Sequence, residues 1–217
     1  MNRAPGSGGM EAHQKSRFFD FLLASNRPSM QNFEKWVLQP GMLFNSLEQW
    51  WGKNKKRETP HEGIDLCRFQ ETNGRINRIG NSTKIPATFA GSVVKIDDDF
   101  LGKSVYLSHD IFSQDRRRLY TVYGHTTPLA AIKPGKKVAA GETIAVVSGP
   151  GPRGTDILPH LHLTFAWIPV SLDPGHLTWQ NLARDPRITL MDPLEVLSPP
   201  VIGIKEASRS PAPGATG

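Results

Sequence analysis

The sequence predicts a mainly β protein: an antiparallel β sandwich or open barrel-like core, preceded by short N-terminal helices. Runs rich in β-branched and aromatic residues follow one another from about residue 60 to residue 197, bounded by Gly, Pro or Asp. The 217-residue chain also contains 20 Gly and 18 Pro, which favours turns and short strands over long helices. This length suits one full domain with additions, rather than two large domains.

Changes in composition divide the chain into four segments. These are a disordered leader over residues 1–15, a helical extension with a basic linker over 16–57, the β domain over 58–197 and a disordered tail over 198–217. The leader is rich in Gly and Ser, and the tail ends in SPAPGATG. Neither composition offers enough apolar surface to fold.

The helical extension is predicted from apolar residues at helical spacing. They indicate three short helices, over residues 18–22, 29–37 and 43–51. Ser29 is placed to cap the second helix and Pro40 to stop it. The basic run over residues 53–57 is interpreted as a solvated linker.

In the β domain, four runs carry the strongest strand signal: Phe89–Ile96, Ser104–Leu107, Leu119–His125 and Thr143–Val147. Residues 171–190 interrupt the strands with Pro, His and Trp, and are predicted to be an insertion.

Charge and cysteine content limit the function classes. A net charge of +6 is compatible with nucleic acid, anionic lipid or cell-wall polymers, and does not choose among them. The single cysteine, Cys67, excludes an intrachain disulfide and a CxxC zinc site, so any metal must rely on His and carboxylate ligands. No run has the length of a transmembrane helix, and no signal peptide is visible in this chain.

Two short segments carry metal-ligating residue types. In the first, Pro60-HEGIDL, an extended chain places His61 and Asp65 on one side, with Gly63 leaving room between them. In the second, PHLHL, alternation places His160 and His162 on one face. Zinc accepts His nitrogen and Asp oxygen, and a catalytic site takes three protein ligands and leaves the fourth position for water.

A third segment, Val122-Tyr-Gly-His, adds a further candidate histidine. The same alternation predicts that Tyr123 and His125 share a face. Histidines that are not ligands would supply the proton transfers that hydrolysis needs. Each motif alone is weak, but the three in this order are much stronger.

These motifs resemble the lysostaphin-like family of zinc endopeptidases, which cut peptide cross-links in peptidoglycan. HEGIDL matches the HxxxD strand of that family, PHLHL its HxH strand and VYGHTTPL its Tyr-Gly/Ala-His segment. IPATFAGSVVKI, IKPGKKVAAGETIAVV and MDPLEVL match further parts of the core in the same order, so that the resemblance covers roughly residues 60–197.

Carried over by position, the resemblance implies a zinc-dependent endopeptidase with one Zn²⁺ per chain, bound by His61, Asp65 and His162. His125 and His160 would be the catalytic pair, with their individual roles left open. Tyr123 would help to stabilise the oxyanion. The substrate would be a peptidoglycan peptide in an extracytoplasmic location, with no nucleic acid partner expected. The sequence leaves the oligomeric state open.

The chain also departs from the family pattern. The family commonly has HLHFE where this chain has HLHLT, so a carboxylate that could support the ligands is absent. Inserts at residues 68–84 and 171–190 are expected to enlarge the rim of the cleft.

Several alternatives stay open at this point. The extension over residues 16–57 could pack on the catalytic domain, inhibit it through an Asn on the metal, or anchor the chain to a surface. His109 is interpreted as a surface turn histidine, and Cys67 as a packed thiol. A non-catalytic cell-wall binding regulator is the main competing function. A phosphohistidine carrier is a second competitor, although it would not need Asp65.

Overall fold

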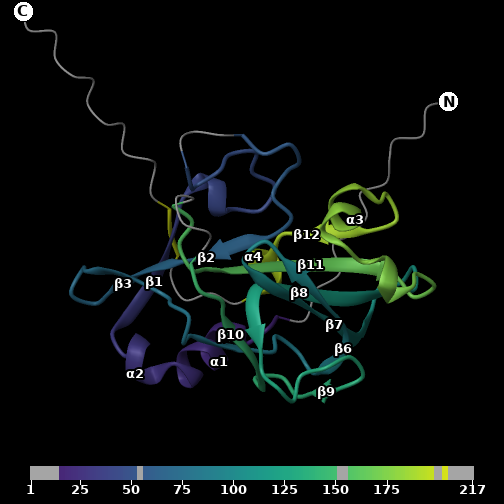
Figure 1. Cartoon of the computed structure of the whole chain (residues 1–217), viewed down its shortest axis with the longest axis horizontal. Helices are drawn as coiled ribbons and strands as arrows, with labels where there is room; N and C mark the ends of the chain where they lie inside the picture. The colour runs from purple at the N-terminus through teal and green to yellow at the C-terminus, as the bar shows by residue number, and fades with distance from the viewer. Residues whose placement is uncertain (1–14, 53–55, 151–155, 198–201, 205–217) are drawn as a thin grey trace, which may run out of the picture.

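The computed structural model describes residues 15–52, 56–150, 156–197 and 202–204, and confirms the mainly β fold (Figure 1). The described residues form two sheets, and nearly all of the strand pairs in them are antiparallel. The helices are short. Among the described residues, no helix has both the length and the apolar character needed to cross a membrane.

The larger sheet has nine strands and carries the candidate site. Its main path is β12 (Thr189–Met191), β11 (Leu161–Pro169), β8 (Arg117–Pro128), β7 (Gly102–Phe112), β6 (Gly91–Asp99) and β9 (Lys137–Val138). Off this path, β2 (Ile64–Leu66) pairs with β11, while β10 (Thr143–Val147) pairs with β8 and with β5 (Lys84–Pro86). The four strand runs expected from the sequence are confirmed as β6, β7, β8 and β10.

Both faces of the larger sheet are covered. Leu119 and Tyr123 of β8 enter the main hydrophobic cluster, which also contains residues of the smaller sheet. Tyr120 and Val122, which alternate with them, enter a second cluster. The insertion over 171–190, with η2 (Pro174–His176) and α3 (Trp179–Arg184), supplies the cover of that second cluster.

The smaller sheet corrects the prediction of a second N-terminal helix. Residues 33–38 form strand β1 (Phe33–Leu38), between β3 (Arg68–Glu71) and β13 (Ile202–Ile204), and β4 (Ile76–Arg78) completes the sheet. The ladders on both sides of β1 satisfy its backbone groups and bury Trp36 completely. This tertiary pairing outweighs the helical spacing of the apolar residues.

The first predicted helix is confirmed as α1 (Phe18–Ser25), followed by the single turn α2 (Arg27–Met30). The third is wrong, because only a 3₁₀ turn, η1 (Pro40–Met42), precedes irregular chain over residues 43–52. There the backbone bonds to the HxxxD segment: Asn45 N–H donates to the His61 carbonyl, and His61 N–H donates to the Ser46 carbonyl.

The predicted end segments lie mostly outside the described residues. Residues 1–14 of the expected leader are not described, nor are 198–201 and 205–217 of the expected tail. Residues 202–204 of that tail form β13 and pair with β1 in parallel, which corrects the prediction for this part. Before the tail lies helix α4 (Pro193–Val196), which Asp192 caps by accepting a hydrogen bond from Leu194 N–H.

Candidate metal centre

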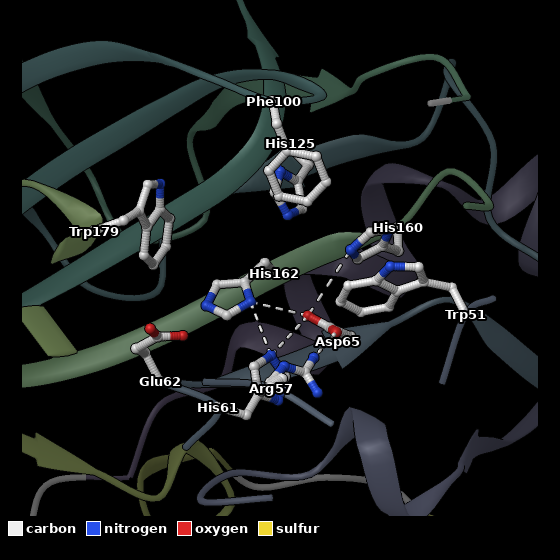
Figure 2. Close-up of a pocket in the computed structure, with 10 residues that line it drawn as sticks. All are labelled: Trp51, Arg57, His61, Glu62, Asp65, Phe100, His125, His160, His162 and Trp179. Carbon is white, nitrogen blue, oxygen red and sulfur yellow. Dashed lines mark hydrogen bonds and ion pairs between the residues drawn. The ribbon is translucent and has the colours of Figure 1, made fainter. Parts of the chain in front are cut away.

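Strand pairing brings the three predicted ligands together. Asp65 on β2 stands directly opposite His162 on β11, and His61 lies just before β2. His162 Nδ1 is 2.9 Å from Asp65 Oδ1, His61 Nε2 is 3.1 Å from the same oxygen, and the two ring nitrogens are 3.0 Å apart. Figure 2 shows the Asp65 carboxylate between the rings of His61, His162 and His160.

Gly63 makes this close approach of β2 to β11 possible. A Cβ atom at residue 63 would lie 2.2 Å from the Leu163 carbonyl oxygen. The glycine in HEGID therefore has a packing reason, as the sequence suggested, and the pairing that positions Asp65 depends on it.

The donor chemistry of the three residues fits a zinc ion. His61 Nδ1 is 2.9 Å from the Leu43 carbonyl, which can only accept, so Nδ1 carries the proton and Nε2 presents a lone pair to the cluster. His162 Nε2 is 2.8 Å from Thr164 Oγ1, which leaves Nδ1 for the cluster. Two nitrogen donors and one carboxylate oxygen thus converge, the ligand types that a catalytic zinc site uses.

Thr164 stands at the position where the family motif commonly has a carboxylate. Its hydroxyl contacts the outer nitrogen of His162. This polar contact supports the ligand ring without adding a negative charge.

Burial and the imidazoles set the protonation of the cluster. Burial raises the pKa of Asp65, but the charges of His61 and His160 and hydrogen bonds from His162 and His61 outweigh it and hold the pKa well below the usual range. Burial lowers the pKa of His162 to about 3. Ionised Asp65 and neutral His162 are the forms in which these groups bind metals.

His160 and His125 lie beside the three predicted ligands. The Leu158 carbonyl accepts from His160 Nδ1 at 2.8 Å, so Nε2 presents a lone pair, 3.9 Å from Asp65 Oδ1. The rings of His125 and His160 have centroids 4.7 Å apart. The alternation in PHLHL therefore places both histidines of this strand at the cluster, as predicted.

Tyr123 is a correction, because it does not share a face with His125. Its hydroxyl bonds to Thr88 N and Oγ1, at 2.7 and 2.8 Å, inside the main hydrophobic core, and burial raises its pKa. It cannot stabilise an oxyanion at the cluster from there. The cause is a β-bulge, where the register between β7 and β8 shifts by one residue and His125 adopts a φ of 62°.

Asp99 is a site residue that the sequence analysis missed. Its Oδ1 is 3.1 Å from His125 Nδ1, and its Oδ2 accepts from His125 N–H at 2.8 Å and from Ser104 Oγ at 2.7 Å. Burial opposes ionisation, but these hydrogen bonds outweigh it and lower the pKa of Asp99. The carboxylate fixes the His125 ring and directs Nε2 away from itself. Asp99 ends β6, which β7 separates from the His125 strand β8, so no local sequence signal indicates this contact.

A cavity of about 240 Å³ opens over the cluster. Besides the four histidines and Asp65, it is lined by Trp51, Arg57, Glu62, Phe100 and Trp179. Figure 2 shows Trp51 and Trp179 on opposite sides of the histidine cluster. Trp179 comes from the insertion over 171–190, which therefore does shape the rim. Residues 68–84, which contain β3 and β4, line no part of this cavity.

Arg57 corrects the linker prediction. Residues 53–55 lie outside the described chain, but the Arg57 side chain is only 11% exposed and its Nη2 is 3.5 Å from Asp65 Oδ2. Lys56 lies in an isolated β-bridge with Glu48. The end of the basic run is therefore part of the candidate site.

Two further residues can be placed away from the cluster. His109 is wrong as a surface turn residue, because it lies within β7, is fully buried, and contacts Ala90 O and Thr121 Oγ1; burial lowers its pKa to about 4. Cys67 is a packed thiol, as expected. Its Sγ contacts the Pro159 carbonyl, and burial raises its pKa to about 11.

Solved structures that are similar to this chain include the following three, each at low identity. A zinc containing peptidase from Vibrio cholerae is 21% identical with a TM-score of 0.36, over 49% of this chain and 26% of that one. A mutant catalytic domain of the prophage-encoded M23 protein EnpA from Enterococcus faecalis is 24% identical with a TM-score of 0.34, over 52% and 73%. Lysostaphin is 17% identical with a TM-score of 0.40, over 70% and 51%.

The chain thus spans about a quarter of the length of the Vibrio cholerae peptidase. None of the curated proteins matches this chain. The family model of Peptidase family M23 matches residues 59–174, more than half of the 217 residues. That span holds the HxxxD, Tyr-Gly-His and HxH segments, and the chain belongs to peptidase family M23, the lysostaphin-like peptidases.

Proposed function

We propose that this chain is a zinc-dependent endopeptidase that hydrolyses peptide bonds in peptidoglycan cross-links, in an extracytoplasmic location. One Zn²⁺ would be held by His61, Asp65 and His162. The observation that carries this proposal is the convergence of their ligand atoms, all within 4.8 Å of one another and buried, in a family M23 domain.

Bound there, zinc would supply a Lewis acid for the scissile carbonyl and would lower the pKa of water toward about 7. The remaining chemistry belongs to the residues around it. His160 presents an unprotonated Nε2 toward the cluster, and burial lowers its pKa, so it is suited to take a proton from the attacking water.

His125 is suited to the opposite role. The Asp99 carboxylate holds the ring through Nδ1, so that Nε2, when it carries a proton, can donate to the developing oxyanion or to the leaving amine. Since the two rings are adjacent, a proton taken up on one side of the cluster can be given up on the other.

The substrate class rests on the resemblance and on the shape of the site. Trp51, Phe100 and Trp179 give the cavity aromatic walls against which a peptide can pack, and the net charge of +6 favours an anionic polymer. Peptidoglycan combines peptide bridges with such a polymer.

The test is digestion of purified peptidoglycan by the zinc-loaded full chain, with new amino groups and soluble peptides as the readouts. We expect release by the parent, loss with a chelator, recovery with zinc, and a fall of roughly 10²–10⁴-fold in His160→Ala. His109→Gln is the matched control, because it removes a buried histidine outside the cluster. Wall binding without any release of peptides would instead favour the non-catalytic regulator.

A further inference from the structure

We propose that Trp50 and Arg57, which precede the family-matched residues 59–174, hold the second oxygen of Asp65 and thereby set the affinity of the site for its metal. The inference rests on the proposed zinc site. It concerns how tightly the site holds the ion and which part of the chain provides that strength.

The two oxygens of Asp65 have separate partners. Oδ1 faces the donor cluster, 2.9 Å from His162 Nδ1 and 3.1 Å from His61 Nε2. Oδ2 accepts from the Trp50 indole N–H at 2.6 Å and lies 3.5 Å from Arg57 Nη2. The carboxylate is therefore held in one orientation that offers a single oxygen to the cluster.

Removing the donors to Oδ2 would weaken this arrangement for two reasons. Asp65 is 1% exposed, so water cannot readily replace the lost hydrogen bond. The carboxylate would also be free to rotate about its bond to Cβ. Metal binding would then have to fix its orientation, and the conformational entropy lost in doing so would reduce the affinity for the metal. Hydrogen-bond partners behind metal ligands typically contribute about 10–100-fold to metal affinity.

The segment that carries these donors is itself fixed in place. Arg57 Nη1 donates to the carbonyls of Gly41, at 2.9 Å, and Glu48. The Arg57 guanidinium lies over the Trp51 ring, 4.9 Å from its centroid. Because its donors are already oriented, Arg57 does not act as a mobile surface charge.

The same segment supports the other ligands. The Leu43 carbonyl accepts from His61 Nδ1, and the Trp50 ring packs edge-on against His160, with centroids 5.0 Å apart. Leu43, Trp50 and Arg57, which all precede β2 in the sequence, therefore contact the donor set. A chain that began at residue 59 would keep the three ligands but would lose these partners.

The competing explanation is that Trp50 is an ordinary packing residue. Trp50→Phe separates the two, because phenylalanine keeps an aromatic ring and removes the N–H that reaches Asp65. Trp51→Phe is the matched control, since it keeps an aromatic ring under Arg57 and, within the described chain, the Trp51 indole makes no hydrogen bond to Asp65. Arg57→Gln removes the cation and provides a second, independent variant.

The experiment measures the zinc dissociation constant of each full-length variant by competition with a chromogenic chelator. Thermal unfolding of the metal-free proteins is the check on folding. We expect Trp50→Phe to bind zinc about 10–100-fold more weakly and Arg57→Gln to be weaker than the parent, with Trp51→Phe close to the parent. Equal affinities in Trp50→Phe and Trp51→Phe would overturn the proposal.

Other outcomes are equally decisive. If Trp50→Phe does not fold, Arg57→Gln decides, and parent-like zinc affinity in that variant counts against the inference. If the parent itself binds no zinc, the proposed function fails first. If the parent binds zinc and all variants match it, the zinc site stands and only the role of Trp50 and Arg57 is lost.

Discussion

His125 and Asp99 form a pair whose geometry resembles a histidine oriented by a carboxylate in hydrolytic enzymes. Asp99 accepts from both the ring and the backbone N–H of His125, and Ser104 supports it in turn. The Trp179 indole donates to Ser104 Oγ at 3.0 Å, which links the insertion to this pair. Asp99 thus acts as a positioning residue for His125.

We expect Asp99→Asn to lower kcat by roughly 10²-fold while leaving KM and zinc content near the parent values. The two oxygens of Asp99 accept hydrogen bonds from the backbone N–H and the ring N–H of His125. An amide replaces one of these acceptors with a donor, so the His125 ring loses its fixed orientation. Steady-state kinetics on a soluble cross-link peptide provides the measurement.

Asp98→Asn is the control, since Asp98 is 85% exposed on the same strand and forms an ion pair with the surface residue Lys103. Equal kcat values in the two variants would show that Asp99 does not act through His125.

At the residue scale, the sequence predicted which side chains converge but not how each one is held. His61, Asp65, His160 and His162 follow from the alternation of extended chain, which β2 and β11 obey. Tyr123 fails because a bulge reverses the alternation, and a bulge depends on the partner strand β7.

At the scale of elements, the candidate site depends on one short strand pairing. β2 contains only Ile64–Leu66, and its three pairs with β11 place Asp65 opposite His162. The carbonyl of Leu163 lies where a side chain at residue 63 would have to be. Any side chain at that position would therefore force β2 and β11 to move apart.

Gly63→Ala should lower the free energy of unfolding by roughly 1–3 kcal/mol, because the new methyl group must displace β11. It should also reduce zinc binding, since the same shift moves Asp65 away from His162. Chemical denaturation and metal content measure the two effects.

Gly80→Ala serves as the comparison, because a Cβ there meets no atom within 4 Å. We expect it to change stability by no more than about 0.5 kcal/mol. If Gly63→Ala matched it in both measurements, the pairing of β2 with β11 would not be what positions the ligands.

The element predictions succeeded where strands form from local runs and failed where pairing is distant. β6, β7, β8 and β10 carry continuous apolar and β-branched runs. The helical spacing around Trp36 was misleading, because β1 forms its pairs with distant parts of the chain. One partner is β3, 30 or more residues further along, and the other is β13, near the C-terminus. The path of residues 43–52, and the contacts of Trp50 and Arg57, could not be predicted for the same reason.

For the whole molecule, the N-terminal residues and the family-matched residues share one hydrophobic core. Phe18, Phe19 and Leu22 of α1 belong to the same buried cluster as Ile64 and Leu163. Of the three roles considered for residues 16–57, these contacts favour packing against the family-matched residues. We propose that residues 16–57 fold together with residues 58–197 as one unit.

Phe19→Ala should accordingly destabilise the whole chain by about 3–5 kcal/mol, because Phe19 is 1% exposed and its removal leaves a cavity in the shared core. Unfolding should remain a single transition when followed by tryptophan fluorescence and by loss of bound zinc. Phe112→Ala, at a position that is 50% exposed, should change stability by about 0.5 kcal/mol or less. Two separate transitions, with only the first shifted by Phe19→Ala, would show that the extension folds by itself.

The central claim is that His61, Asp65 and His162 hold one zinc ion, and elemental analysis of the purified chain tests it most directly. The parent and His109→Gln should each contain about one equivalent of zinc. His162→Ala should contain little, because a site with three protein ligands loses most of its zinc affinity when one of them is removed. No zinc in the parent after reconstitution at neutral pH, or equal zinc in the parent and His162→Ala, would contradict the claim.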